Sequence, residues 1–189
     1  MNFSRNNLLA LVLLIVCTAI FRMIPYEARA GILGAPQIAM AVFAGSVVAQ
    51  KRWAFALPIF SMFLSDVVMQ VIHWSNPAMM PGFYEGQFVN YLLVASLTVI
   101  GFFISKRNVL EIGAGAVAAP SVFFILSNFA VWAGNGGLKR PKTMEGLLQT
   151  LADGLPFYKI DIASCLVWSA VLFGSYFLLT SSAKKTAVA

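Results

Sequence analysis

The stretch WAFALPIFSMFLSDVVMQVIH, residues 53–73, decides the fold of this chain. It is dominated by apolar side chains, and its most polar residues, Asp66, Gln70 and His73, all lie in its second half. A helix that crosses the hydrocarbon core of a bilayer needs about 20 mostly apolar residues. The stretch therefore predicts a transmembrane helix with polar groups toward one end.

The composition of the whole chain supports the same class. Of its 189 residues, 60% are hydrophobic and 11% are charged, and the mean hydropathy is +0.83. Soluble domains are nearer about 45–50% apolar and about 25% charged. We therefore expect an integral membrane protein with one transmembrane domain over residues 1–189.

The apolar runs predict an all-α bundle of six transmembrane helices. Backbone groups in lipid must be paired internally, and the chain lacks the alternating strands of about ten residues that build a membrane barrel. A weakly amphipathic stretch at 143–155 is expected along the outer surface. The predicted spans are about 7–24, 36–50, 53–73, 88–105, 110–132 and 157–180.

The distribution of charge predicts the orientation of this bundle. The net charge is +6, and cations occur in pairs between apolar runs, at Lys51-Arg52, Lys106-Arg107 and Lys184-Lys185. Cytoplasmic loops carry such an excess of Lys and Arg. We expect both termini in the cytoplasm and no binding of nucleic acid.

The first 30 residues allow two interpretations. A basic start, an apolar run and the sequence Ala28-Arg29-Ala30 resemble a signal peptide with its cleavage site. Arg22 and Glu27, however, put charges where a signal peptide is usually uncharged. We favour a retained first helix.

Polar residues of several spans are expected at one level of the membrane. Asp66, Gln70 and His73 share one face of their helix, and Asp66 lies about 20 Å from its basic end. Because successive spans cross the membrane in opposite directions, polar residues of other spans are expected at the same level as Asp66. They either mark helix ends near water or line a cup open to the outside. The candidate lining residues are Arg22, Asp66, Gln70, His73, Asn128, Trp132 and Asp161.

Asp66 needs a cation or several hydrogen-bond donors to stay ionised inside a membrane, and we expect Arg22 or Lys159 to supply the charge. Small residues recur at one-turn spacing in the second span, at Ala41, Gly45 and Ala49. Such a stripe either packs helices closely within the bundle or docks a partner subunit.

Catalytic motifs are not found in the sequence. One histidine cannot form a multi-histidine metal site, no serine lies in a G-x-S-x-G context, and there is no glycine-rich phosphate loop. We expect no catalytic residues, no metal and no cofactor.

Several stretches together resemble one family. They are FRMIP at 21–25, PQIAMAVFAG at 36–45, the 53–66 region, SNFAVW at 127–132, RPKTMEGL at 140–147 and LPF at 155–157. The resemblance is to small bacterial multi-pass membrane proteins similar to the substrate-binding S components of energy-coupling-factor transporters. It implies a bacterial cytoplasmic membrane, six helices, an extracellular substrate cup, and partnership with a membrane T subunit and two ATPases.

Positions that match the family pattern include Arg22, Gly45, Asp66, Asn128 and Trp132. The first span departs from many S components, because it lacks an Ala-x-x-x-Ala face for the T subunit. We expect a solute-binding subunit for uptake of a small nutrient, such as a vitamin or its precursor. The alternatives are a structural or assembly protein and, less favoured, a small membrane enzyme.

Overall fold

A computed structural model describes residues 16, 20–21, 24, 34, 36–134 and 136–186, and all regular secondary structure in this part of the chain is helical. Most of the predicted first span, with Arg22 and the signal-peptide question, lies outside the described residues. The elements are α2 (Gln37–Val47), α3 (Lys51–Ser75), α4 (Gln87–Ser96), α5 (Thr98–Gly101), α6 (Val109–Ala133) and α7 (Met144–Thr186).

Three of these helices are long and apolar enough to cross a membrane: Lys51–Ser75, Val109–Ala133 and Met144–Leu178. The expected spans 53–73 and 110–132 agree with α3 and α6 to within about two residues. The spans expected at 36–50, 88–105 and 157–180 need correction. Gln37–Val47 and Gln87–Gly101 are shorter apolar helices, and the second is divided at Leu97 into α4 and α5.

The predicted separation between an amphipathic stretch at 143–155 and a span at 157–180 is wrong. Both belong to the continuous helix α7, with Pro156 inside it. A proline inside a helix removes one backbone hydrogen bond, but the helix can continue past it. At 1.5 Å per residue α7 is about 65 Å long, which is roughly twice the hydrocarbon core of a bilayer.

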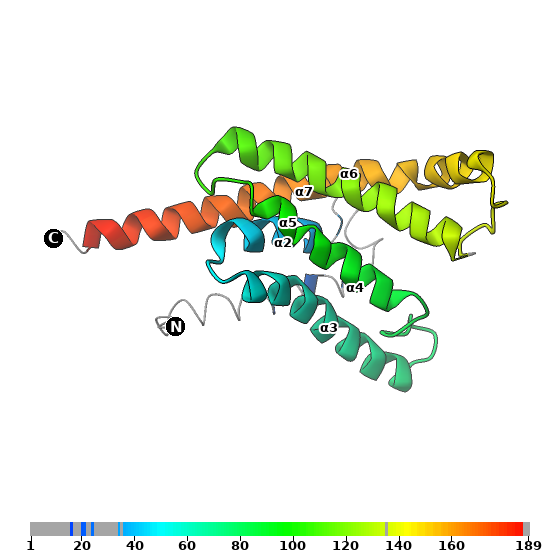
Figure 1. The fold of residues 1–189 in the computed structure, drawn as a ribbon. Helices are drawn as coiled ribbons and strands as arrows, with labels where there is room; N and C mark the ends of the chain where they lie inside the picture. Colours follow the sequence, from blue (N-terminus) through cyan, green and yellow to red (C-terminus); the bar gives the residue numbers. More distant parts are fainter. Residues whose placement is uncertain are drawn as a thin grey trace.

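Helix α2 lies at the centre of the molecule. It packs against α3, α4, α5, α6 and α7, and all its residues from Gln37 to Gly45 are buried. A helix that is hydrophobic all round is expected in such a position. Figure 1 shows the α3–α4 pair diverging from the α6–α7 pair, with α2 and α5 where the two pairs converge.

The contact between α2 and α5 is made by glycine backbones. A Cβ atom on Gly45 would lie 2.2 Å from the carbonyl oxygen of Thr98, and one on Gly101 would lie 2.2 Å from that of Val42. Only glycine permits such an approach. We call this converging region, which includes Gly45, the start of α3 at Lys51 and the loop that carries Lys106, the basic end. The opposite region, where the helix pairs diverge, is the polar end.

Candidate functional site

The polar end begins at Asp66, whose side chain is 1% exposed in α3. Its Oδ2 atom accepts hydrogen bonds from Gln87 Nε2 and from the hydroxyl of Tyr91, both in α4. Gln87 Nε2 also lies 3.1 Å from the Tyr91 hydroxyl. Gln87 and Tyr91 are one helical turn apart and therefore share a face of α4. The buried carboxylate thus joins α3 to α4.

The rest of the predicted polar stripe of α3 holds the loop that leads to α4. Gln70 Oε1 accepts a hydrogen bond of 3.1 Å from the backbone nitrogen of Phe83. His73 Nδ1 lies 2.6 Å from the carbonyl oxygen of Met79. Because a carbonyl oxygen only accepts, Nδ1 donates the hydrogen. Asp66, Gln70 and His73 do share one face, and the contacts of Gln70 and His73 are with residues 79–83.

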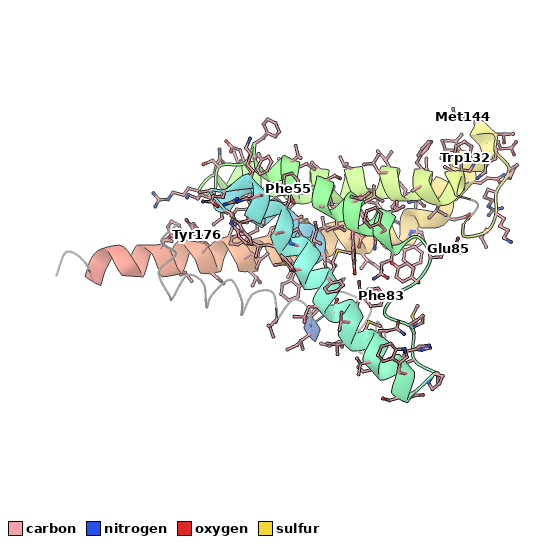
Figure 2. All side chains as sticks on the ribbon, turned by 60° about the horizontal axis from the view of Figure 1, so that its bottom comes forward. Phe55, Phe83, Glu85, Trp132, Met144 and Tyr176 are labelled. Carbon is pink, nitrogen blue, oxygen red and sulfur yellow. The ribbon has the colours of Figure 1, made fainter. Side chains whose placement is uncertain are left out.

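Gly82 explains how this loop reaches the helix. A Cβ atom at this position would lie 1.8 Å from the carbonyl oxygen of Asp66 and 2.6 Å from the nitrogen of Gln70. The loop backbone therefore rests directly on the backbone of α3. Figure 2 shows Phe83 and Glu85 in this loop, away from the end of the molecule that carries Phe55 and Tyr176.

A second group of contacts closes the tip of the α6–α7 pair, marked by Trp132 and Met144 in Figure 2. Trp132 Nε1 donates a hydrogen bond of 2.9 Å to the carbonyl oxygen of Pro141. The ammonium group of Lys142 lies 5.2 Å from the centre of the Trp132 ring system. Arg140 forms an ion pair of 3.0 Å with Asp153, and its Nε also donates to that carboxylate.

Asn128 lies within the packing of the same pair. Its Nδ2 donates a hydrogen bond of 2.7 Å to the carbonyl oxygen of Phe124 in α6. A Cβ atom on Gly154 of α7 would lie 2.6 Å from Asn128 Oδ1, so the two helices are in close contact here. The amide therefore supports the α6–α7 contact.

Asp161 lies beside the residue that precedes α2. Its Oδ1 atom is 3.5 Å from the Cβ position of Gly34. The backbone nitrogen of Gly34 donates to Ser164 Oγ over 2.5 Å, and Trp168 Nε1 donates to the Gly34 carbonyl oxygen over 3.2 Å. The entry to α2 is therefore held against α7 at the level of Ser164.

Beside this entry lies Gln37, a residue that the sequence did not single out. It is 6% exposed, and its Nε2 atom has no hydrogen-bond partner among the described residues. A buried donor left unpaired costs about 1–3 kcal/mol, so a native fold keeps few of them. Gln37 is therefore an available donor at the start of the central helix. In the described part of the chain, Gln50 Oε1 and Thr98 Oγ1 are also buried and unpaired.

The structure divides the predicted cup residues into three groups. Asp66, Gln70 and His73 are in the α3–α4 pair, Asn128 and Trp132 are in the α6–α7 pair, and Asp161 is beside Gly34. Arg22 lies outside the described residues. Asp66 accepts hydrogen bonds from two neutral donors, and Lys159, the second cation expected beside it, is exposed.

The small-residue stripe of α2 is used in packing within the chain. Ala41 is 0% exposed, Gly45 contacts α5, and Ala49 is exposed beyond the end of the helix. The packing interpretation accounts for Ala41 and Gly45, and docking of a partner stays a prediction. Neither Gln87 nor Tyr91 was among the predicted lining residues, although their one-turn spacing at the start of a span was a usable signal.

No three His, Cys, Asp or Glu side chains come together as a metal site within the described ranges. The fold and the candidate site thus define a class: a helical protein with candidate membrane spans and a polar end. The chain belongs to a family of unknown function (DUF6580), whose model matches residues 2–187. Comparison with curated proteins and with solved structures finds no match.

Proposed function

We propose that this chain is a membrane-embedded solute-binding subunit for the uptake of a small nutrient, similar to the S components of energy-coupling-factor transporters. In this proposal six spans lie in the bacterial cytoplasmic membrane with both termini inside. A membrane T subunit and two ATPases supply the energy, because the chain has no phosphate-binding loop of its own.

The observation that carries the proposal is the unpaired amide of Gln37 at the start of α2. Helix α2 packs against both helix pairs where they converge (Figure 1), so Gln37, its first residue, lies between them. A buried donor at this point gains a hydrogen bond when a solute with an acceptor atom enters. Asp66 of α3 and Asp161 of α7 add acidic side chains on two helices that pack against α2.

The mechanism follows from the two helix pairs. A solute enters from the polar end and is held by groups from α2, α3 and α7. Partner subunits then tilt or repack one pair against the other, which changes the distance between these groups and releases the solute. No covalent bond is made or broken in this sequence of events.

Native mass spectrometry of protein purified gently from its membrane tests the proposal. It predicts that part or all of the wild-type protein carries a bound small molecule. The same compound, added to emptied protein, should raise the thermal unfolding temperature. Protein that is repeatedly empty, with no thermal shift against a panel of vitamins and precursors, would contradict the proposal.

A second candidate, a structural or assembly protein, is favoured by the contacts of Gln70 and His73. Both side chains hold the loop between α3 and α4, which is a purely structural task. This candidate predicts that substitutions at the polar end change stability and never change the occupancy of a ligand.

A further inference from the structure

An open apolar groove of about 320 Å³ lies between α5 and α6 near the basic end. Its walls come from Val99 and Phe103 on one side and from Ala114 and Ala118 on the other, and Glu111 also lines it. The groove is continuous with exposed apolar surface, since Phe103 is 81% exposed. In a chain that lies in a membrane, such a surface faces lipid.

The small side chains of α6 create the groove. Ala114 and Ala118 are exposed and one turn apart, so they form a shallow stripe along the helix. Between them, a Cβ atom on Gly115 would lie 2.1 Å from Ile104 Cδ1. Ile104 therefore packs on the glycine and forms the floor. From Glu111 to Ala118 the groove runs about 10 Å along α6.

The end of the groove meets the basic loop between α5 and α6. Lys106 and Arg107 are exposed in this loop, and the Lys106 ammonium group lies 5.5 Å from the ring centre of Tyr176 in α7. Lys51, the first residue of α3, is close to this loop, because its ammonium group lies 5.1 Å from the ring centre of Phe102. Cationic side chains beside an apolar groove are suited to a lipid whose headgroup is anionic.

Glu111 is the acidic exception at this end, and its carboxylate is already engaged. Glu111 Oε2 accepts a hydrogen bond of 2.6 Å from the nitrogen of Ser105, and Oε1 accepts one of 2.7 Å from Asn108 Nδ2. Asn108 in turn caps the start of α6. These bonds fix the loop that presents Lys106 and Arg107, and the cations outnumber this single carboxylate.

We propose that this groove binds an anionic phospholipid, with one acyl chain along Ala114 and Ala118 and the phosphate beside Lys106 and Arg107. The binding needs only that the chain lies in a membrane, and it is independent of the proposed solute function. The apolar walls provide affinity for any acyl chain. The cations provide the preference for a negative headgroup, which weakens as salt screens the charges.

The test is native mass spectrometry of the full chain in detergent, titrated with phosphatidylglycerol or phosphatidylcholine of the same acyl chains. Wild-type protein should bind phosphatidylglycerol more tightly. A contribution of about 1 kcal/mol per cation corresponds to about a fivefold loss of this preference in Lys106→Gln or Arg107→Gln. Lys139→Gln, an exposed cation outside the basic end, is the matched control.

The groove itself is tested by Ala118→Phe, which fills it from the lipid side. This variant should lose the tightly bound lipid of either headgroup, while Ala170→Phe, at an exposed alanine of α7, should keep it. Equal affinity of wild-type protein for the two lipids would overturn the proposal. Equal behaviour of Ala118→Phe and Ala170→Phe would overturn it too, because the lipid would then be annular only. The thermal unfolding temperature of each variant shows that it is folded.

Discussion

The two ends of this molecule are built from different kinds of contact. At the basic end, α2 and α5 meet through the glycine backbones of Gly45 and Gly101, and the hydrogen bonds there, such as those of Glu111, fix the neighbouring loop. At the polar end, Asp66 joins α3 to α4 by hydrogen bonds, and Gln70 and Trp132 hold loops in the same way. Close backbone packing leaves no room for adjustment, whereas a loop held by single hydrogen bonds can shift. The basic end should therefore carry the stability, and the polar end should tolerate change.

The largest effect is expected for Gly45→Ala. The new methyl group would lie 2.2 Å from the Thr98 carbonyl oxygen, so α5 must move. We expect a loss of stability at the upper end of the overpacking range, about 3 kcal/mol. Thermal unfolding in detergent measures it. The matched control is Gly113→Ala, where the methyl group has no neighbour within 4 Å. Equal unfolding temperatures for the two variants would contradict the difference between the ends.

A somewhat smaller effect is expected for Asp66→Asn at the polar end. The substitution removes the charge that accepts hydrogen bonds from Gln87 and Tyr91. Hydrogen bonds to a charged group contribute about 1.5–3 kcal/mol, so we expect a loss of about 2 kcal/mol. Chemical denaturation in detergent provides the measurement. An unchanged midpoint would show that the carboxylate does not join α3 to α4.

Gly82→Ala tests whether a loop at the polar end can move to make room for a methyl group, as a helix at the basic end cannot. Its methyl group would lie 1.8 Å from the Asp66 carbonyl oxygen, which is closer than at Gly45. Because the loop can lift away, we expect a loss of only about 1 kcal/mol, at the low end of the overpacking range. Limited proteolysis should cut residues 76–86 faster than in the control Gly174→Ala. A loss of stability as large as that of Gly45→Ala would contradict the difference between the two ends.

The smallest effect is expected at the tip of the α6–α7 pair. Arg140 and Asp153 are 33% and 39% exposed, and ion pairs on a surface contribute about 0.2–1 kcal/mol. Asp153→Asn should therefore change stability by less than 1 kcal/mol, and the change should decrease further at high salt. A larger loss, insensitive to salt, would mean that this tip is buried in the assembled protein.

The sequence predicted the long helices best, because length and apolar composition determine them locally. It also placed Asp66, Gln70 and His73 on one face of α3, since that follows from helical geometry. The break at Leu97 carries no glycine or proline signal, and the extension of α7 through Pro156 depends on its packing against α6. These features arise from tertiary contacts that periodicity does not contain.

The candidate site was harder to predict for the same reason. The partners of Asp66 come from α4, and the close contact at Gly82 is known only once the loop is folded onto α3. Gln37 lies within the quoted stretch PQIAMAVFAG, but only burial and the lack of a partner distinguish its amide from any other glutamine. Composition indicates that a polar end exists, and three-dimensional packing decides which donors remain available there.

The most direct test of the proposed solute binding compares Gln37→Met with Thr98→Val. Each variant removes one buried polar group that has no partner among the described residues, and neither should lower stability. Native mass spectrometry of gently purified protein then measures the occupancy of the bound small molecule. Binding at the polar end predicts loss of the ligand in Gln37→Met and wild-type occupancy in Thr98→Val. Equal occupancy in the two variants, or an empty wild-type protein, would contradict it.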